Sequence, residues 1–126
     1  MTFVDANVFM YAVGRPHPLR GDAQKFFEET LRADERLVTS VEVLQELMHA
    51  YLPVGRFDVL DSALALARAR TATIWSIEPA DFELARALAD VEDGLSARDL
   101  LHLACCRRRG VTRIRTFDRA LAAAGS

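Results

Sequence analysis

Short β-type runs alternate with longer segments of helical periodicity along the 126 residues of the chain. The runs that favour strands are residues 2–4, 37–39, 73–77 and 112–116. The segments that favour helices are residues 6–13, 17–33, 41–52, 57–72, 78–91, 96–109 and 118–124. Because strands and helices alternate with short connections, the pattern predicts an α/β fold with a parallel sheet, formed by a single domain over residues 1–126.

Polar side chains lie where three of the predicted strands end. Asp5 directly follows the first strand, Ser40 ends the second, and Asp118 follows the fourth. Asp99 lies in the first turn of the helix before the fourth strand, and Glu46 lies less than two turns into the helix after Ser40. Because ligands bind beyond the carboxyl ends of parallel strands, we expect these groups to converge at one edge of the sheet.

Each acidic residue also has a purely structural interpretation. Asp5 and Asp118 are suited to cap the helices that follow them, and Ser96 to Asp99 has the spacing of a capping box. On the helix over 41–52, Glu46 shares the polar face with Glu42, and periodicity alone does not favour one over the other. The pattern therefore indicates an acidic edge without proving a site.

Clustered carboxylates at such an edge would have a definite chemistry. Two carboxylates about 5 Å apart repel each other by roughly 3 kcal/mol at an effective dielectric of 20. A divalent cation relieves that repulsion, and all-oxygen ligands favour Mg²⁺ or Mn²⁺. Such ions activate water and stabilise charge in phosphodiester hydrolysis. The residues by themselves thus indicate a possible metal site and a hydrolytic use for it.

Four segments resemble, in order, the four motifs of PIN-domain ribonucleases: residues 3–9, 40–46, 95–104 and 115–119. The resemblance covers nearly the whole chain and is closest to VapC-type toxins of type II toxin–antitoxin pairs. It implies a PIN-like three-layer α/β/α sandwich whose central parallel sheet has four or five strands.

The resemblance also implies a set of site residues. The acidic quartet of the family corresponds to Asp5, Glu46, Asp99 and Asp118. These would be the catalytic residues and would bind one or two Mg²⁺ or Mn²⁺ ions. Asn7, Ser40 and Thr116 would be supporting groups that orient the carboxylates or a metal-bound water. The resemblance thus favours Glu46 over Glu42.

Substrate and partners follow from the same resemblance. Such toxins hydrolyse RNA, leaving a 3′-hydroxyl and a 5′-phosphate, and are usually homodimers. A VapB-type antitoxin inhibits them by filling the acidic cleft with its C-terminal segment, and the complex binds its own operator DNA. We expect the same RNA substrate, antitoxin partner, homodimer and operator binding here.

The composition of the chain restricts the class of protein and its location in the cell. Hydrophobic residues make up 51% and charged residues 27% of the chain, which excludes a disordered protein. No stretch of 18 apolar residues lacks a charge and no signal peptide is evident, so we expect no membrane contact and a cytoplasmic location. The two cysteines, Cys105 and Cys106, are adjacent and do not indicate a disulfide scaffold.

Arginines gather towards the end of the chain, where residues 98–126 hold seven arginines and two acidic residues. Arg98 and Arg119 flank the acidic motifs and are the first candidates for RNA contacts. The run 107–109 either complements the dipole at the end of a helix or contacts the RNA backbone. The three histidines have no metal-ligand spacing with one another, so none is predicted to be a ligand.

Two other functions compete. An acidic-site phosphatase or phosphotransferase uses a second acid two residues after its nucleophile and a late lysine, but here Asn7 follows Asp5 and the one lysine is Lys25. A non-catalytic PIN-like RNA-binding or scaffold module would have lost its acids, whereas all four are present. Metal-dependent RNA hydrolysis is therefore the preferred interpretation.

Overall fold

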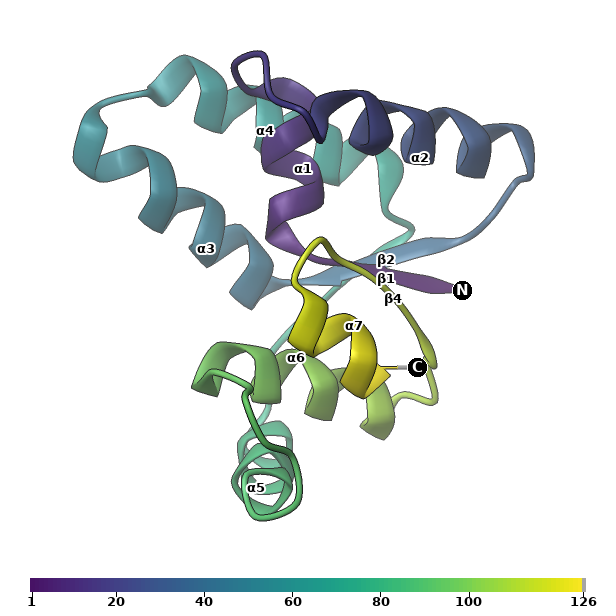
Figure 1. The fold of residues 1–126 in the computed structure, drawn as a ribbon, viewed down its shortest axis with the longest axis vertical. Helices are drawn as coiled ribbons and strands as arrows, with labels where there is room; N and C mark the ends of the chain where they lie inside the picture. The colour runs from purple at the N-terminus through teal and green to yellow at the C-terminus, as the bar shows by residue number, and fades with distance from the viewer. Residues whose placement is uncertain (126) are drawn as a thin grey trace.

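The structure is a computed structural model and describes residues 1–125, in which four parallel strands lie between two layers of helices (Figure 1). The strands are β1 (Thr2–Val4), β2 (Leu37–Ser40), β3 (Thr73–Trp75) and β4 (Arg113–Arg115). The helices are α1 (Ala6–Val13), α2 (Arg20–Arg32), α3 (Val41–Tyr51), η1 (Leu52–Val54), α4 (Phe57–Arg70), α5 (Pro79–Leu88), α6 (Ala97–Arg108) and α7 (Arg119–Gly125). The predicted α/β sandwich is confirmed.

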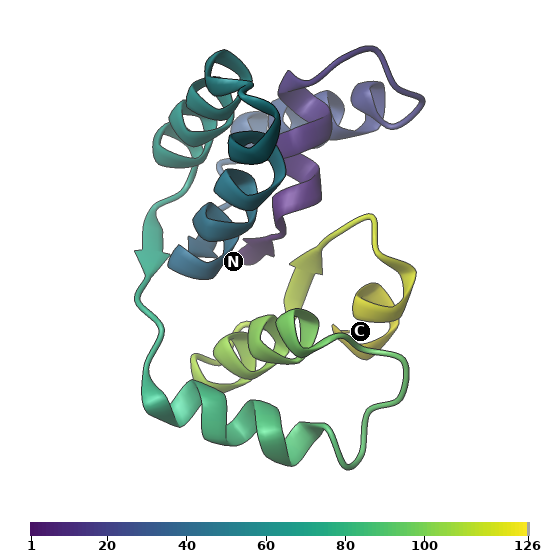
Figure 2. The ribbon, with the colours of Figure 1, turned by 90° about the vertical axis from the view of Figure 1, so that its left-hand side faces the viewer.

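The strand order β3-β2-β1-β4 creates a switch point in the sheet. The connections from β1 to β2 and from β2 to β3 run through α1–α4 on one face, whereas the connection from β3 to β4 runs through α5 and α6 on the other (Figures 1 and 2). The crossovers therefore diverge between the paired strands β1 and β4. In open parallel sheets, a crevice for ligands forms at this point, beyond the carboxyl ends of the strands.

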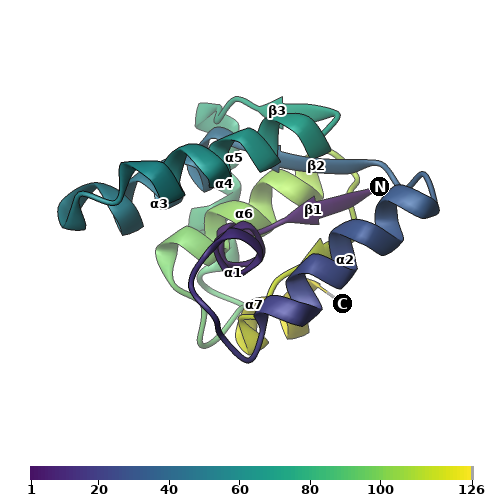
Figure 3. The same cartoon turned by 90° about the horizontal axis from the view of Figure 1, so that it is seen from above.

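Two apolar clusters cover the two faces of the sheet. The larger one joins β1 and β2 to α1–α4, with Phe3, Phe9 and Leu47 fully buried in it. In this layer α1 lies between α2 and α3 (Figure 3). The smaller cluster joins α5, α6 and α7, with Leu103 and Leu121 at its centre. The larger cluster thus fixes α3 on one face of the sheet, and the smaller cluster fixes α6 on the other.

Some predicted helix boundaries are wrong by a few residues. The helix predicted from residue 17 begins at Arg20, because the ring nitrogen Nδ1 of His17 accepts a hydrogen bond from the Leu19 N–H and holds the preceding segment in a turn. The helix predicted over 78–91 ends at Leu88, after which residues 89–91 form turns. In residues 1–125 no helix has the length and apolar character needed to cross a membrane.

Candidate active site

A pocket of about 460 Å³ opens at the switch point, and carboxylates line it. Asp5 comes from the end of β1, Glu46 from the middle of α3, Asp99 from the first turn of α6 and Asp118 from the segment after β4. The structure thus brings all four predicted acidic residues into one cavity, which we term the acidic pocket. Glu46 lines this pocket and Glu42 does not.

Asp5 is held by contacts on both of its oxygens. Its Oδ1 accepts a hydrogen bond from the Ala6 N–H at 2.7 Å, which makes it the N-cap of α1. Its Oδ2 accepts the hydroxyl proton of Thr116 at 2.7 Å. Only 5% of the Asp5 surface is exposed, so the carboxylate is fixed at the floor of the pocket. The capping interpretation is correct, and it does not exclude the site.

Asn7 and Thr116 link the two strand ends that form the switch point. The Asn7 amide donates to Thr116 Oγ1 at 3.2 Å, and its carbonyl oxygen accepts the Phe117 N–H at 3.1 Å. Thr116 Oγ1 also accepts the Asp118 N–H at 3.0 Å. Asp118 in turn caps α7 by accepting the Leu121 N–H at 3.0 Å. The supporting contacts predicted for Asn7 and Thr116 are therefore present.

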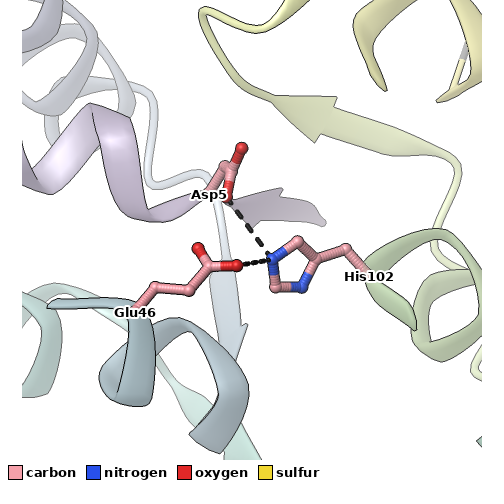
Figure 4. A group of neighbouring side chains, drawn as sticks. All are labelled: Asp5, Glu46 and His102. Carbon is pink, nitrogen blue, oxygen red and sulfur yellow. Dashed lines mark hydrogen bonds and ion pairs between the residues drawn. The ribbon is translucent and has the colours of Figure 1, made fainter. Parts of the chain in front are cut away.

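Glu46 meets a histidine that sequence reasoning left out. The Nε2 atom of His102 lies 2.8 Å from Glu46 Oε1 and 3.6 Å from Asp5 Oδ1, so the three side chains converge from α3, α6 and β1 (Figure 4). His102 is 0% exposed and Glu46 is 9% exposed. From the pocket side, the exposed Arg98 approaches the same Oε1 through its Nε at 3.4 Å.

The surroundings shift the pKa values of these groups. Burial raises the pKa of Glu46, although its hydrogen bond with His102 opposes the change. Burial also raises the pKa of Asp99, and the neighbouring Asp118 charge adds to the increase. For His102, burial alone would lower the pKa, but the hydrogen bond and charge of Glu46 outweigh it and raise the pKa. A cation bound in the pocket would therefore stabilise the ionised forms of Glu46 and Asp99.

The donor set suits a hard divalent ion. One oxygen of Asp5 and one oxygen of Glu46 lie within 4.8 Å of each other. Asp99 and Asp118 add carboxylates to the same cavity, and burial disfavours the ionised form of Asp99 in the absence of a cation. Carboxylate oxygens are ligands that Mg²⁺ and Mn²⁺ prefer. The residues present fit the ion that the motifs imply.

Two of the predicted supporting or contact residues lie apart from the pocket. Ser40 is fully buried and its hydroxyl accepts the Val43 N–H at 3.4 Å, so it caps α3 and touches none of the four carboxylates in the contacts described. Arg119 is exposed and does not line the pocket, whereas Arg98 does. The geometry therefore favours Arg98 as the cation beside the site.

The arginine run 107–109 is structural, and the alternative of an RNA backbone contact is not supported. Arg108 and Arg109 each place a nitrogen 2.7 Å from Asp81 Oδ1, and Asp81 is fully buried on α5. Arg109 also stacks over the ring of Trp75 at 4.9 Å. Arg107 pairs with Glu92 at 3.4 Å. These contacts join the end of α6 to α5 and β3.

The sequence did hold a signal for His102. It follows Asp99 by three residues on α6, which places both side chains on one helix face. The three histidines have no metal-ligand spacing with one another, so this signal is visible only when His102 is compared with Asp99. A comparison of histidine with the acidic motifs would have placed His102 beside the predicted site.

A larger cavity of about 750 Å³ adjoins the acidic pocket. Apolar side chains of α5 and α6 dominate its lining, among them Phe82, Leu100 and Leu101. It shares Ser96 and Arg98 with the acidic pocket, so the two cavities are neighbours at the first turn of α6. We refer to it as the apolar pocket.

Known proteins share both the sequence and the fold. Residues 2–126 match the PIN domain family. The chain is 63% identical over 124 residues to Ribonuclease VapC23 of Mycobacterium tuberculosis (strain CDC 1551 / Oshkosh), which covers 98% of each chain. It is 40% identical over 119 residues to Ribonuclease VapC13 of Mycobacterium tuberculosis (strain ATCC 25618 / H37Rv), covering 94% of this chain and 91% of that relative.

A solved structure has the same fold. The crystal structure of Mycobacterium tuberculosis VapC20, described as a Sarcin-Ricin loop cleaving toxin, matches with a TM-score of 0.79 and 22% identity over 99% of this chain and 95% of that one. The four carboxylates of the acidic pocket come from the four segments that resemble the PIN-domain motifs. The chain belongs to the PIN-domain family, among the VapC ribonucleases.

Proposed function

We propose that this chain is a metal-dependent endoribonuclease toxin that hydrolyses RNA phosphodiester bonds in the cytoplasm, with Asp5, Glu46, Asp99 and Asp118 as its catalytic, metal-binding residues. The convergence of these four carboxylates in one pocket at the switch point is the observation that carries the proposal. The relatives that are 63% and 40% identical are ribonucleases by name, which supports the same reaction class.

The residues of the pocket divide the work between them. Asp5, Glu46, Asp99 and Asp118 would hold one or two Mg²⁺ or Mn²⁺ ions, which would supply an activated water and stabilise charge on the phosphate. Asp5 is pre-oriented by the Ala6 N–H and the Thr116 hydroxyl, so little ordering is needed when an ion binds. Asn7 and Thr116 keep the Asp118 segment beside β1.

Arg98 places a positive charge at the edge of the acidic pocket. Four carboxylates alone would repel the phosphate backbone, and an arginine at the entrance lessens that repulsion. Arg98 is exposed, lines the pocket and lies 3.4 Å from Glu46. We therefore assign the first RNA contact to Arg98, with Arg119 as a more distant second.

The two neighbouring pockets support a protein inhibitor of the VapB type. Its C-terminal segment would place a basic side chain among the carboxylates and apolar side chains in the neighbouring cavity, beside Phe82 and Leu100. Such an occupant would exclude RNA and metal together. The complex, rather than the free toxin, would bind operator DNA.

A homodimer is part of the proposal. Large apolar side chains are exposed on α3, η1 and the start of α4, namely Val41, Met48, Leu52, Val54 and Phe57. A surface of this kind is typical of a subunit interface. Light scattering of the purified chain should give twice the mass of 14.0 kDa if the dimer forms.

Cleavage of purified RNA tests the proposed reaction. Wild-type protein should fragment RNA with Mg²⁺ or Mn²⁺ and leave it intact with a chelator. Asp5→Asn should reduce the rate by at least about 100-fold, whereas Asp90→Asn, an exposed carboxylate outside the pocket, should not change it. Cleavage by Asp5→Asn at the wild-type rate would contradict the proposal.

A further inference from the structure

We propose that His102 is a positioning residue that holds Glu46 in its metal-binding orientation through the Nε2–H donor, and that it is not itself a metal ligand. The inference rests on the proposed function, since it concerns how this chain presents a carboxylate to the metal. It begins from the 2.8 Å contact between His102 Nε2 and Glu46 Oε1 (Figure 4).

Glu46 needs such a partner more than Asp5 does. The short Asp5 side chain is fixed by the Ala6 N–H and the Thr116 hydroxyl. The longer Glu46 side chain has more rotatable bonds, and its described polar partners are His102 and Arg98. Arg98 is half exposed, so its hold on Glu46 is screened by water. Among residues 1–125, His102 is therefore the buried group that fixes the Glu46 carboxylate.

The imidazole is itself held rigidly. His102 is fully buried on α6, and its ring packs on the ring of Phe3 with centroids 5.3 Å apart. Phe3 lies in β1, one of the two inner strands, and Asp5 follows the end of β1. Because the ring is packed in this way, its Nε2 atom stays directed at Glu46 Oε1, with Asp5 Oδ1 at 3.6 Å.

The other ring nitrogen argues against direct ligation. A metal-bound histidine nearly always donates its second N–H to a carboxylate, a carbonyl or water. His102 Nδ1 is buried and makes no hydrogen bond with any residue of the part of the chain that the structure describes. The tautomer that would coordinate through Nε2 would therefore leave a buried N–H without an acceptor. The opposite tautomer donates from Nε2 to Glu46.

The position of the ring leads to the same conclusion. Asp5, Glu46, Asp99 and Asp118 line the acidic pocket, but His102 does not. The imidazole is fully buried, whereas the Glu46 carboxylate belongs to the lining of the cavity. An ion that enters the pocket thus meets carboxylate oxygens, while His102 holds Glu46 from the protein interior.

Metal affinity tests the inference without relying on activity. We would titrate Mg²⁺ and Mn²⁺ into wild type, His102→Leu and His102→Gln by calorimetry. Leucine fills the space without a donor and should weaken both ions by the same factor, about 10- to 100-fold. Glutamine places an amide N–H near the position of Nε2 and should restore affinity to within about threefold of wild type. The double variant with Glu46→Gln should show no further loss from His102→Leu.

Spectroscopy separates a ligand from a positioning residue. Pulsed electron paramagnetic resonance of the Mn²⁺-loaded wild type should show no coordinated ¹⁴N. A directly bound nitrogen, a loss confined to Mn²⁺, or no rescue by glutamine would each overturn the inference while leaving metal-dependent cleavage intact. If His102→Leu does not fold, His102→Asn replaces it, because the asparagine amide is too short to reach Glu46. A wild-type chain that binds neither ion would contradict the proposed function as well.

Discussion

The hydroxyl of Thr116 lies 2.7 Å from Asp5 Oδ2, across 111 residues of sequence, and joins the carboxyl ends of β1 and β4. The same oxygen accepts the Asp118 N–H at 3.0 Å. One side chain of nine per cent exposure therefore sets the positions of two of the four pocket carboxylates. Its importance is geometric, because it fixes the switch point at which the pocket opens.

Replacing Thr116 by valine keeps the shape and removes the hydroxyl. We expect a loss of about 1–3 kcal/mol in the free energy of unfolding, because the Asp5 carboxylate loses a buried donor. Metal affinity and cleavage rate should fall about 10- to 100-fold. Thr116→Ser keeps the donor and serves as the control in chemical denaturation and cleavage assays. Equal behaviour of the valine and serine variants would show that the hydroxyl does not hold Asp5.

Removing the Asp99 charge should stabilise the metal-free protein. Burial and the Asp118 charge raise the pKa of Asp99, so its ionised form is unfavourable in the folded state at neutral pH. This penalty disappears as the pH falls and Asp99 is protonated. Asp99→Asn should therefore raise the melting temperature at pH 7 in chelator, and by less at pH 4, while abolishing cleavage.

The control for Asp99→Asn is Asp93→Asn, since Asp93 is exposed in the preceding loop and does not line the pocket. Saturating Mg²⁺ should reverse the order of stability, because only wild type gains from binding, by about 2.7 kcal/mol at 100 times the dissociation constant. A metal-free Asp99→Asn protein less stable than wild type would contradict the electrostatic account.

The Asp81 network should matter for stability and little for cleavage. Asp81→Asn removes the charge that Arg109 and Arg108 share, and we expect a loss of about 3 kcal/mol at pH 7. Hydrogen bonds from Arg109 hold the pKa of Asp81 far below its usual range. Its stabilising contribution is thus present above the ordinary aspartate pKa of about 4 and is lost as the pH falls through the folded value.

Urea denaturation at pH 7 and pH 3 would measure this difference. Asp90→Asn breaks an exposed pair with Arg86 and should cost no more than about 0.5 kcal/mol at either pH. The gap between the Asp81 and Asp90 variants should narrow on acidification. A gap that widens at pH 3 would show that the ion pair does not act as described.

Arg98 should contribute to RNA affinity more than Arg119 does. Binding is best measured in the Asp5→Asn background, where RNA stays intact, across a series of salt concentrations. If Arg98 neutralises one phosphate, Arg98→Ala should lower the slope of log K against log salt by about 0.7 for single-stranded RNA. Arg32→Ala, at the end of α2, is the control. Equal slopes for Arg98→Ala, Arg119→Ala and Arg32→Ala would contradict an RNA contact by Arg98.

The fold and the acidic residues were largely predictable. Alternation of strands and helices predicted a parallel sheet, and the position of Asp5 and Asp118 after β1 and β4 placed them at one edge. Glu46 needed the family resemblance, because helical periodicity placed it on the same face as Glu42. In the structure Glu46 lines the acidic pocket, whereas Glu42 lines the apolar pocket.

The partners of the buried charges were not predictable. Asp81 and Arg109 are 28 residues apart, and their pairing depends on how α5 packs against α6. His102 and Glu46 are 56 residues apart and meet only because α3 and α6 approach the switch point from opposite faces of the sheet. Local spacing carries no information about such pairs, although the Asp99–His102 spacing on one helix was an available signal.

The chemistry of the new RNA ends tests the central claim most directly. Purified protein would be incubated with total cellular RNA in Mg²⁺, and ends bearing a 5′-phosphate would be sequenced, with chelator and Asp99→Asn as controls. Metal-dependent hydrolysis at the acidic pocket predicts discrete 5′-phosphate ends that disappear in both controls. Ends that persist with Asp99→Asn, or fragments bearing 5′-hydroxyls, would contradict it.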